Sequence, residues 1–263
     1  MSSGLDLGLT GRKAIVCGSS SGLGLACARA LADCGVELVL NGRHREKLEA
    51  AAEAIAARTG NAPAIVAADV ATPEGRAQLL SACPDPDVLV TNAGGPPAGD
   101  FRSFDEATWL AAIQANMLSA IFLINGVVDG MIARGWGRII NITSAAVKAP
   151  MAPLALSNGA RSGLTGFVAG VSRQVAPHGV TINNLLPGPF ATDRLTGFAA
   201  RMGAERGVGA DAVMAEMAGA VPMGRVGDPD EFGAWCAFVA SRQASFMTGQ
   251  NLVLDGGGYP GML

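Results

Sequence analysis

The chain has 263 residues, long for one ordinary domain and short for two unless it forms a single large α/β sheet. Hydrophobic residues make up 49% and charged residues only 16%, which is enough for a large core and for subunit interfaces. The formal net charge of −3 argues against a nucleic-acid partner, which would need a basic stripe.

Neither the apolar runs nor the cysteines indicate a membrane, secreted or metal-binding protein. The longest apolar run, MLSAIFLINGVV, is broken by Asn125 and is shorter than the roughly 18 residues that cross a bilayer. The first residues, MSSGLDLGLTG, lack the basic and apolar regions of a signal peptide. Five cysteines form an odd count without a CxxC pair, so we expect no metal, no disulfide framework and a cytoplasmic location.

The chain begins with alternating short apolar runs and helical stretches. RKAIVC (residues 12–17) predicts a strand that ends in the loop GSSSGLG, and an Ala/Leu-rich helix follows as far as Cys34. Gly35 after this helix, and Gly60 at the end of a second helix over residues 45–60, are typical C-terminal stops. Between the two helices, VELVLN predicts the second strand.

The same alternation continues to the C-terminus, with two long helices predicted at about residues 105–134 and 157–175. The predicted strands are residues 12–17, 36–41, 62–70, 86–94, 137–144, 179–188 and 251–257. Because strand and helix alternate without a break in composition, we predict one dinucleotide-binding domain over residues 1–263. Its fold would be α/β, a doubly wound parallel sheet of about seven strands with helices on both faces.

Residues 190–224 are the one irregular region, and they follow the carboxyl end of a predicted strand, where ligands bind in such sheets. The region contains four methionines, Met202, Met214, Met217 and Met223. Methionines suit an adaptable apolar surface, so the region is interpreted as a helical lid or substrate loop. Packing of these methionines in the core or at a subunit interface is an equally good interpretation.

The loop after the first strand has the composition of a phosphate site. Its glycines allow a tight turn and a close approach of the backbone, and the N–H groups at the start of the next helix favour a pyrophosphate. The strand before the loop and the helix after it give the glycine pattern its required context. The residues expected to contact the cofactor here are Gly18, Ser20, Ser21, Gly22, Leu23 and Gly24.

The end of the second strand indicates which nucleotide binds. A site that prefers NAD usually has an Asp or Glu near this point, which accepts a hydrogen bond from the ribose. Residues 41–43 include no carboxylate, and Arg43 offers a planar set of donors suited to a 2′-phosphate. The sequence therefore predicts NADP(H), with NAD(H) as the alternative if Arg43 only begins the next helix.

Several further motifs occur in an order typical of one family. After GxxxGxG they are Asp69-Val70, Asn92-Ala93-Gly94, Asn116, Ser144, Pro187-Gly188 with Thr192, and the terminal TGQNLVLDGG. Over essentially the whole chain this pattern resembles the short-chain dehydrogenase/reductase family, and in particular its 3-oxoacyl-carrier-protein-reductase-like branch.

The resemblance implies how the cofactor would be held. Asp69, with Val70 beside it, would bind the adenine amino group. Asn92-Ala93-Gly94 would line the cofactor and stabilise the sheet. Thr192, with the backbone near Pro187-Gly188, would hold the nicotinamide carboxamide.

The resemblance also implies the catalytic residues, and here the chain departs from the family. Asn116 would anchor a water in a proton relay, and Ser144 would hydrogen-bond the substrate carbonyl. The family has a tyrosine and a lysine further on, but counting 13 residues from Ser144, and then four more, reaches Ser157 and Arg161. The only tyrosine of the chain, Tyr259, is close to its C-terminus.

This departure changes how the site handles protons. A phenol has a pKa of about 10, which neighbouring positive charge can lower toward neutrality, whereas a serine hydroxyl is a far weaker acid. Arg161 keeps the positive charge but, unlike lysine, cannot relay protons. Loss of a positioned general acid costs on the order of 10²–10⁴ in rate, which predicts a slow enzyme rather than none. Lys148, four residues after Ser144, is the candidate for a replacement acid or carboxylate anchor, although a solvated loop lysine is the simpler interpretation.

Two functions therefore stay open. The first is a divergent NADP(H)-dependent oxidoreductase that acts on a small carbonyl or alcohol substrate, apolar or acyl in character. The second is a catalytically silent NADP-binding protein, either a sensor or the non-catalytic subunit of an oligomer. The resemblance implies a homotetramer or homodimer built through the two long helices and the C-terminal strand, and the apolar terminus LVLDGGGYPGML fits such an interface. No membrane partner is expected.

Overall fold

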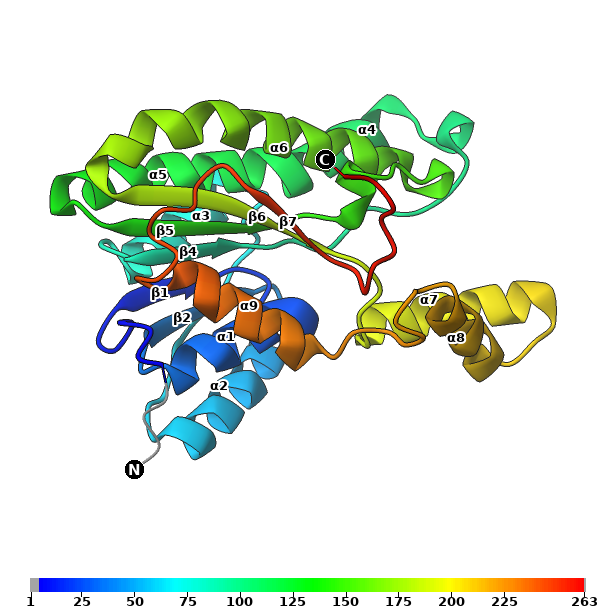
Figure 1. Cartoon of the computed structure of the whole chain (residues 1–263), viewed down its shortest axis with the longest axis horizontal. Coiled ribbons are helices and arrows are strands. Elements are labelled where there is room, and N and C mark those ends of the chain that lie inside the picture. Colours follow the sequence, from blue (N-terminus) through cyan, green and yellow to red (C-terminus); the bar gives the residue numbers. More distant parts are fainter. Residues whose placement is uncertain (1–4, 263) are drawn as a thin grey trace.

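Seven parallel strands form the centre of the protein, whose computed structural model describes residues 5–262 (Figure 1). The strands are β1 (Lys13–Val16), β2 (Glu37–Gly42), β3 (Ala64–Ala67), β4 (Val88–Thr91), β5 (Gly137–Ile142), β6 (Val180–Pro187) and β7 (Asn251–Leu254). Their order across the sheet is β3-β2-β1-β4-β5-β6-β7. The predicted doubly wound sheet is confirmed, although several strands are shorter than their sequence patterns.

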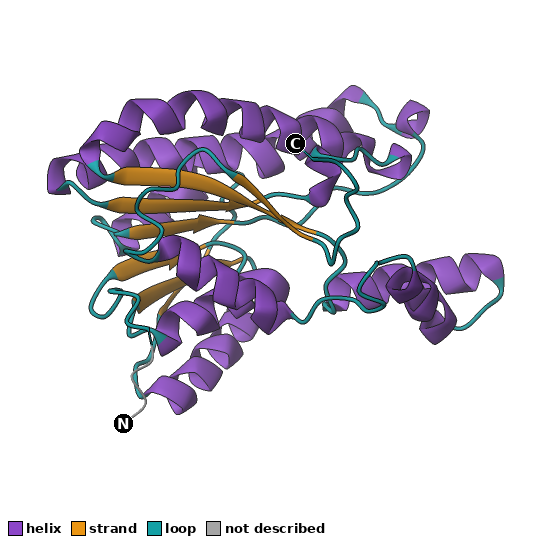
Figure 2. Cartoon of the chain, viewed as in Figure 1, coloured by secondary structure: helices purple, strands orange, loops and turns teal. Residues whose placement is uncertain are grey.

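Helices cover both faces of the sheet (Figure 2). The helices are α1 (Gly22–Asp33), α2 (Arg45–Thr59), α3 (Pro73–Ala82), α4 (Glu106–Ile113), α5 (Ser119–Arg134), α6 (Ala155–Val175), α7 (Asp193–Arg206), α8 (Ala210–Gly219) and α9 (Pro229–Ala240). One face packs against α1, α2 and α9, and the other packs against α3, α5 and α6.

The inner strands are buried on both faces, whereas the edge strands β3 and β7 are only partly buried. In β1, Ala14 and Val16 join the core under α1 and α9, whereas Ile15 and Cys17 join the core under α5 and α6. A strand of this kind appears in the sequence as a continuous apolar run, as RKAIVC does. Full burial of one such aliphatic side chain contributes about 1.5–3 kcal/mol.

The connections leave β1 and β4 in opposite directions, and this fixes the position of the site. From β1 the chain winds outward to β2 and β3, then returns to β4 and winds the other way to β7. The two neighbouring strands therefore have helices on opposite faces, which leaves a crevice at their carboxyl ends, where open α/β sheets bind ligands.

The helix predicted over residues 105–134 has the expected extent but is not regular. It consists of α4, a π-helical turn over Gln114–Leu118, and α5. Asn116 lies in the middle of this turn and is buried. Single π-turns inside α-helices are frequently found at functional sites, because the extra residue redirects the side chains around it.

Taken as one stretch, Glu106–Arg134 is long and apolar enough to cross a membrane, because an 18-residue window within it has a mean hydropathy of 1.6; the expectation from uninterrupted apolar runs did not foresee this. A core helix of a soluble protein meets the same criterion. Here Leu123, Val127 and Met131 of α5 are buried against the sheet, so the stretch is weak evidence for a membrane span.

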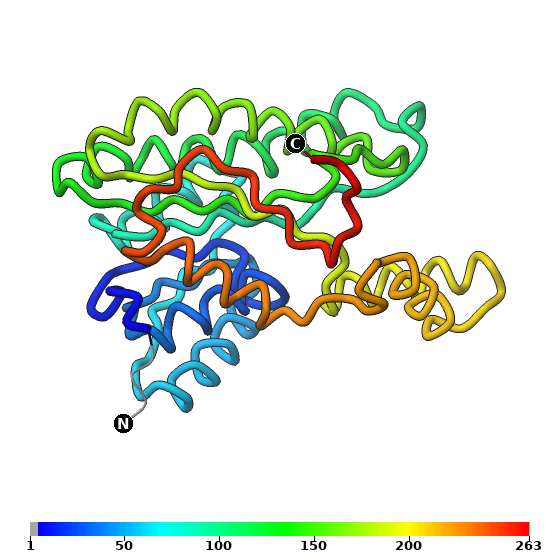
Figure 3. The backbone as a smooth tube through the Cα atoms, in the orientation of Figure 1, coloured from blue at the N-terminus to red at the C-terminus, as the bar shows by residue number. Residues whose placement is uncertain are grey.

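The segment between β6 and α9 forms an arm that projects beyond the carboxyl ends of the strands (Figures 1 and 3). Its helices α7 and α8 pack mainly on each other. The arm leaves and rejoins the body at one place, where Phe190 and Gly227 form an isolated parallel bridge. The Phe190 ring packs edge-on against Phe232 of α9, with 5.3 Å between ring centroids.

The four methionines of residues 190–224 are not buried in the core. Met223 is exposed, and the other three, Met202, Met214 and Met217, are half-buried on the arm. The interpretation that these methionines pack in the core of the chain is therefore wrong.

A chain of polar side chains crosses half of the sheet on its α5–α6 face. Thr91 Oγ1 donates to Asn141 Oδ1 at 2.6 Å, and Asn141 Nδ2 donates to Asn184 Oδ1 at 3.0 Å. Asn184 Nδ2 then donates to Asn251 Oδ1 at 2.8 Å. Each pair is also a register pair of neighbouring strands, so this polar ladder fixes the alignment of β4, β5, β6 and β7.

We expect Asn141→Leu to lower the free energy of unfolding by about 2–4 kcal/mol. The substitution leaves the buried Thr91 hydroxyl and the side-chain oxygen Oδ1 of Asn184 without these hydrogen-bond partners. Urea denaturation followed by circular dichroism measures the change. Asn61→Leu, at an exposed position after α2, is the matched control. Equal midpoints for the two variants would show that the ladder is not needed for stability.

Candidate active site

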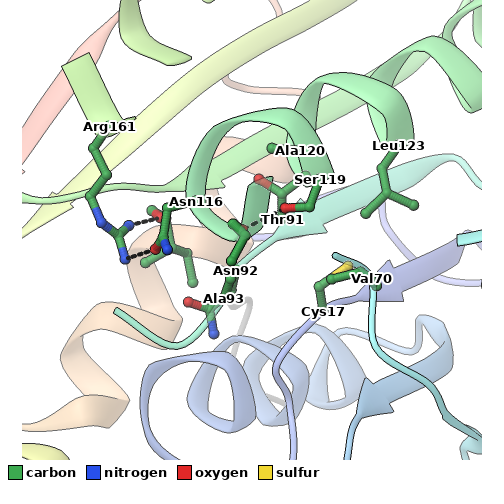
Figure 4. Close-up of a pocket in the computed structure, with 12 residues that line it drawn as sticks. Cys17, Val70, Thr91, Asn92, Ala93, Asn116, Ser119, Ala120, Leu123 and Arg161 are labelled. Carbon is green, nitrogen blue, oxygen red and sulfur yellow. Dashed lines mark hydrogen bonds between the residues drawn. The ribbon is translucent and has the colours of Figure 1, made fainter. Parts of the chain in front are cut away.

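The carboxyl ends of the central strands surround a small cavity of about 10 Å³, enough for about one water molecule (Figure 4). Its walls come from the ends of β1, β4 and β5, from the π-turn and α5, and from α6. The lining residues are Cys17, Val70, Thr91, Asn92, Ala93, Ala115, Asn116, Ser119, Ala120, Leu123, Ile142 and Arg161. Residues that the sequence assigns to the cofactor and to catalysis therefore meet at this one place.

The glycines of the phosphate loop are required by close contacts. Gly18 and Gly22 both have a φ of +56°, a conformation that favours glycine. A Cβ on Gly18 would lie 2.7 Å from Nδ2 of Asn92, and a Cβ on Gly24 would overlap the carbonyl of Gly18. Asn92 Nδ2 also donates to the Gly18 carbonyl at 3.2 Å, which joins the loop to the end of β4.

The helix that follows this loop has no side-chain cap at its start. Ser21 is the N-cap of α1 but makes no capping hydrogen bond, whereas Thr72, Thr192 and Asp228 cap α3, α7 and α9. The first N–H groups of a helix have no intrahelical acceptor, so an uncapped start suits an anionic ligand. The loop and helix start together fit a dinucleotide diphosphate.

The predicted nucleotide residues lie beside the phosphate loop. A Cβ on Gly42 would lie 3.3 Å from Ser20 Oγ, so the exposed Arg43 directly follows a residue in contact with the loop. Asp69 is exposed after β3, and its Oδ1 accepts from the Ala71 N–H at 2.9 Å. The side chain of Asn41 is instead structural, because its Nδ2 donates to two carbonyls at the end of β3.

The segment that follows β6 also lies close to the phosphate loop. The Gly188 N–H donates to the carbonyl of Leu254 at 2.8 Å, which fixes the end of β6 against β7. Thr192 caps α7 by accepting from the Leu195 N–H at 3.4 Å. The Thr192 methyl group lies 3.6 Å from the position of a Cβ on Gly22, so the first turn of the arm sits over the phosphate loop.

Arg161 is the buried cation of the site, with only 7% of its surface exposed. Its Nη1 donates to the carbonyls of Ile142 and Thr143, both at 2.8 Å, and its Nη2 donates to Asn116 Oδ1 at 3.1 Å (Figure 4). Burial, and to a lesser degree the charge of Arg194, lower the pKa of Arg161 to about 10. The guanidinium therefore stays protonated at neutral pH, and within residues 5–262 no carboxylate pairs with it.

The other predicted catalytic residues are near in the chain but are not joined to one another by hydrogen bonds. Ser157 is buried one helical turn before Arg161, on the same face of α6. Ser144 follows β5, and its Oγ accepts from the Ala146 N–H at 3.1 Å. Lys148 is half-buried in the next turn, and its side chain has no hydrogen bond or ion pair among the residues described. Among the predicted catalytic residues, Asn116 and Arg161 are thus the pair that the structure joins by a hydrogen bond.

Two features of the site were missed by sequence reasoning. Cys17 lines the cavity, and burial raises the pKa of its thiol to about 12, so the thiol stays neutral. Arg194, in the first turn of α7, places its guanidinium against Gly95, where a Cβ would overlap it. The sequence carries no local signal for this contact, since the two residues are far apart in the chain.

Comparison with known proteins agrees with this geometry. The family model described as enoyl-(acyl carrier protein) reductase matches residues 18–258. The NADPH-dependent reductase BacG of Bacillus subtilis is 34% identical over 251 residues, which cover 94% of this chain and 97% of the relative. The 3-oxoacyl-(acyl-carrier-protein) reductase FabG of Vibrio cholerae is 32% identical over 257 residues, which cover 96% and 99%.

Solved structures give the same result. L-sorbose reductase from Gluconobacter frateurii, complexed with NADPH and L-sorbose, is similar with a TM-score of 0.93 and 29% identity. The similarity covers 98% of this chain and 100% of that chain. With its phosphate loop, its strand order and the family match over nearly its whole length, the chain belongs to the short-chain dehydrogenase/reductase family and is similar to its 3-oxoacyl-(acyl-carrier-protein) reductases.

Proposed function

We propose that this protein is an NADP(H)-dependent oxidoreductase that interconverts a carbonyl compound and its alcohol with an altered proton donor. The observation that carries the proposal is the position of Arg161, which is hydrogen-bonded to Asn116 and to the end of β5. A buried cation held by three hydrogen bonds beside the cavity indicates a site that is still organised.

The cofactor is assigned from the relatives and from the end of β2. BacG is named an NADPH-dependent reductase, and L-sorbose reductase was solved with NADPH. In this chain Arg43 follows Gly42, which is in contact with Ser20, and residues 41–43 include no carboxylate to select NAD. When bound, NADPH supplies the hydride. The predicted NADP(H) thus agrees with the relatives.

Each residue of the site has a role that its geometry allows. Ser144 would donate a hydrogen bond to the substrate carbonyl, and Ser157 would offer a second hydroxyl from the first turn of α6. Arginine has five N–H donors, and Arg161 uses three on the protein, so two remain for the nicotinamide ribose. Asn116, already held by Arg161, would orient a water in the cavity.

The proposed site differs from a tyrosine-containing site in the group that supplies the proton. A serine hydroxyl donates a hydrogen bond but does not release its proton near neutral pH, and the arginine beside it stays charged. We infer that water supplies the proton and that turnover is slow, by on the order of 10²–10⁴ relative to a tyrosine-containing site. Lys148, half-buried in the turn after Ser144, is the alternative acid.

A catalytically silent NADP-binding protein is the second candidate. It is favoured by one observation, the presence of Ser157 and Arg161 where the family has tyrosine and lysine. Such a protein would act as a sensor or as the non-catalytic subunit of an oligomer, with the cofactor site intact.

The remaining assignments concern the surroundings of the site. The arm of residues 190–224 is proposed to be the lid over a small, apolar or acyl substrate. A homotetramer or homodimer is proposed, because Leu110 of α4, Phe122 of α5 and Met262 near the C-terminus are exposed apolar side chains where the family assembles. A cytoplasmic location is proposed from the five cysteines, which form no CxxC pair.

The protein should bind NADPH, detected by fluorescence, and slowly oxidise it with a member of a panel of ketones, aldehydes and 3-oxoacyl thioesters. Ser157→Ala should then lower kcat by about tenfold, because it removes one hydrogen bond to the reacting oxygen. Turnover that survives Ser157→Ala but is lost in Lys148→Ala would show that Lys148 is the acid. NADPH binding without turnover on any substrate would support the silent protein.

Restoring the family residues gives the second test. Ser157→Tyr combined with Arg161→Lys should raise kcat/KM by about 10²–10⁴, because the phenol next to a lysine can release its proton. Ser162→Tyr, at an exposed position of the same helix, is the control and should leave the rate unchanged. An unchanged rate in the double variant, with NADPH still bound, would contradict the proposed cause of slow turnover.

A further inference from the structure

Arg194 reaches from the arm across to the body of the protein. It is the second residue of α7, and its guanidinium lies against Gly95, which follows the Asn92-Ala93-Gly94 segment after β4. Any side chain at position 95 would collide with it, since a Cβ there overlaps the guanidinium. Because Gly95 has no side chain, there is room for the Arg194 guanidinium at this place.

Two segments near Arg194 are connected to the phosphate loop. On one side, Thr192 of the same turn contacts the Gly22 position of that loop. On the other side, Gly95 is three residues after Asn92, which donates a hydrogen bond to the Gly18 carbonyl. The guanidinium therefore lies against a segment that is joined to the phosphate loop, and the same turn of α7 places Thr192 over that loop.

The charge of Arg194 has no counter-ion in the described part of the chain. Nine arginines there form ion pairs with carboxylates, namely Arg12, Arg29, Arg45, Arg58, Arg102, Arg134, Arg206, Arg225 and Arg242. Arg194 is exposed and is not among them, and the charged groups that interact with it are two more cations, Arg161 and Arg201. The repulsion between the Arg194 and Arg161 guanidinium groups is reduced when an anion binds to Arg194.

We propose that Arg194 is an oxyanion-binding residue carried on the arm, and that the oxyanion is the diphosphate of the cofactor. The proposal rests on the proposed NADP(H) cofactor. A carboxylate on the substrate has the same chemistry. The diphosphate is favoured because the guanidinium lies against Gly95, and the same turn of α7 places Thr192 over Gly22 at the uncapped start of α1. Arginine binds phosphate through two parallel hydrogen bonds, which also fix its orientation.

This contact would couple the arm to the nucleotide. Arg194 is in the first turn of α7, and the arm is joined to the body at the Phe190–Gly227 bridge. A hydrogen bond from Arg194 to the diphosphate would add a second point of attachment. Cofactor binding would then hold the arm against the site before the substrate arrives.

The test measures nucleotide affinity, which does not depend on turnover. Arg194→Met should raise the Kd of both NADPH and NADH by about 10- to 100-fold, because the diphosphate is common to both nucleotides. Arg43→Met should weaken NADPH alone, since only NADPH has the 2′-phosphate. Arg201→Met, at an exposed position of the same helix, is the matched control and should change neither Kd by more than about twofold.

A second variant tests the same contact from its other side. Gly95→Ala should displace the guanidinium and raise both Kd values, and Gly95→Ala combined with Arg194→Met should bind no more weakly than Arg194→Met alone. Unchanged Kd values in Arg194→Met, with a raised KM for carboxylate substrates only, would overturn the diphosphate assignment in favour of the substrate. Unchanged Kd values and KM would overturn the proposal altogether. If the wild-type protein binds neither nucleotide, the proposed function fails instead.

Discussion

A buried guanidinium connects the three elements on which the active site is built. Arg161 joins α6 to the end of β5 and to the π-turn through hydrogen bonds to Ile142, Thr143 and Asn116. An unpaired charge in a protein interior costs several kcal/mol, and here carbonyl oxygens rather than a carboxylate offset that cost. The rigid fork of arginine fixes directions that the flexible ammonium of a lysine would leave free. The guanidinium also stays protonated at neutral pH, so it does not act as a proton carrier.

The sheet beneath the site is aligned by polar contacts in an otherwise apolar layer. The polar ladder of Thr91, Asn141, Asn184 and Asn251 joins four strands and begins at the carboxyl end of β4. Thr91 is directly followed by Asn92, which holds the phosphate loop, so the alignment of β4 with β5 is transmitted to the cofactor groove. Apolar packing alone tolerates small sliding of strands, whereas an amide ladder permits one register.

The sequence predicted the sheet, the phosphate loop and the family because these depend on local patterns. Apolar runs, helix stops and the glycines at 18, 22 and 24 act over a few residues, and the structure confirms the strands and helices that they imply. The π-turn around Asn116, the ladder through Asn141 and the contact of Arg194 with Gly95 were not predicted. Each depends on elements that meet only in the folded chain, and a single sequence has no signal for such pairs. The roles of Ser144, Ser157 and Lys148 stay predictions.

The arm leaves and re-enters the body at the Phe190–Gly227 bridge, so its two ends lie close together. A segment that leaves and re-enters a fold at one point can be lengthened, shortened or replaced, because each doubling of loop length costs only about 0.6 kcal/mol of closure entropy. The strands and the phosphate loop are not disturbed by such exchanges. The part of the proposed lid beyond its first turn can therefore be exchanged in evolution, while the turn that carries Thr192 and Arg194 is kept with the nucleotide half of the site.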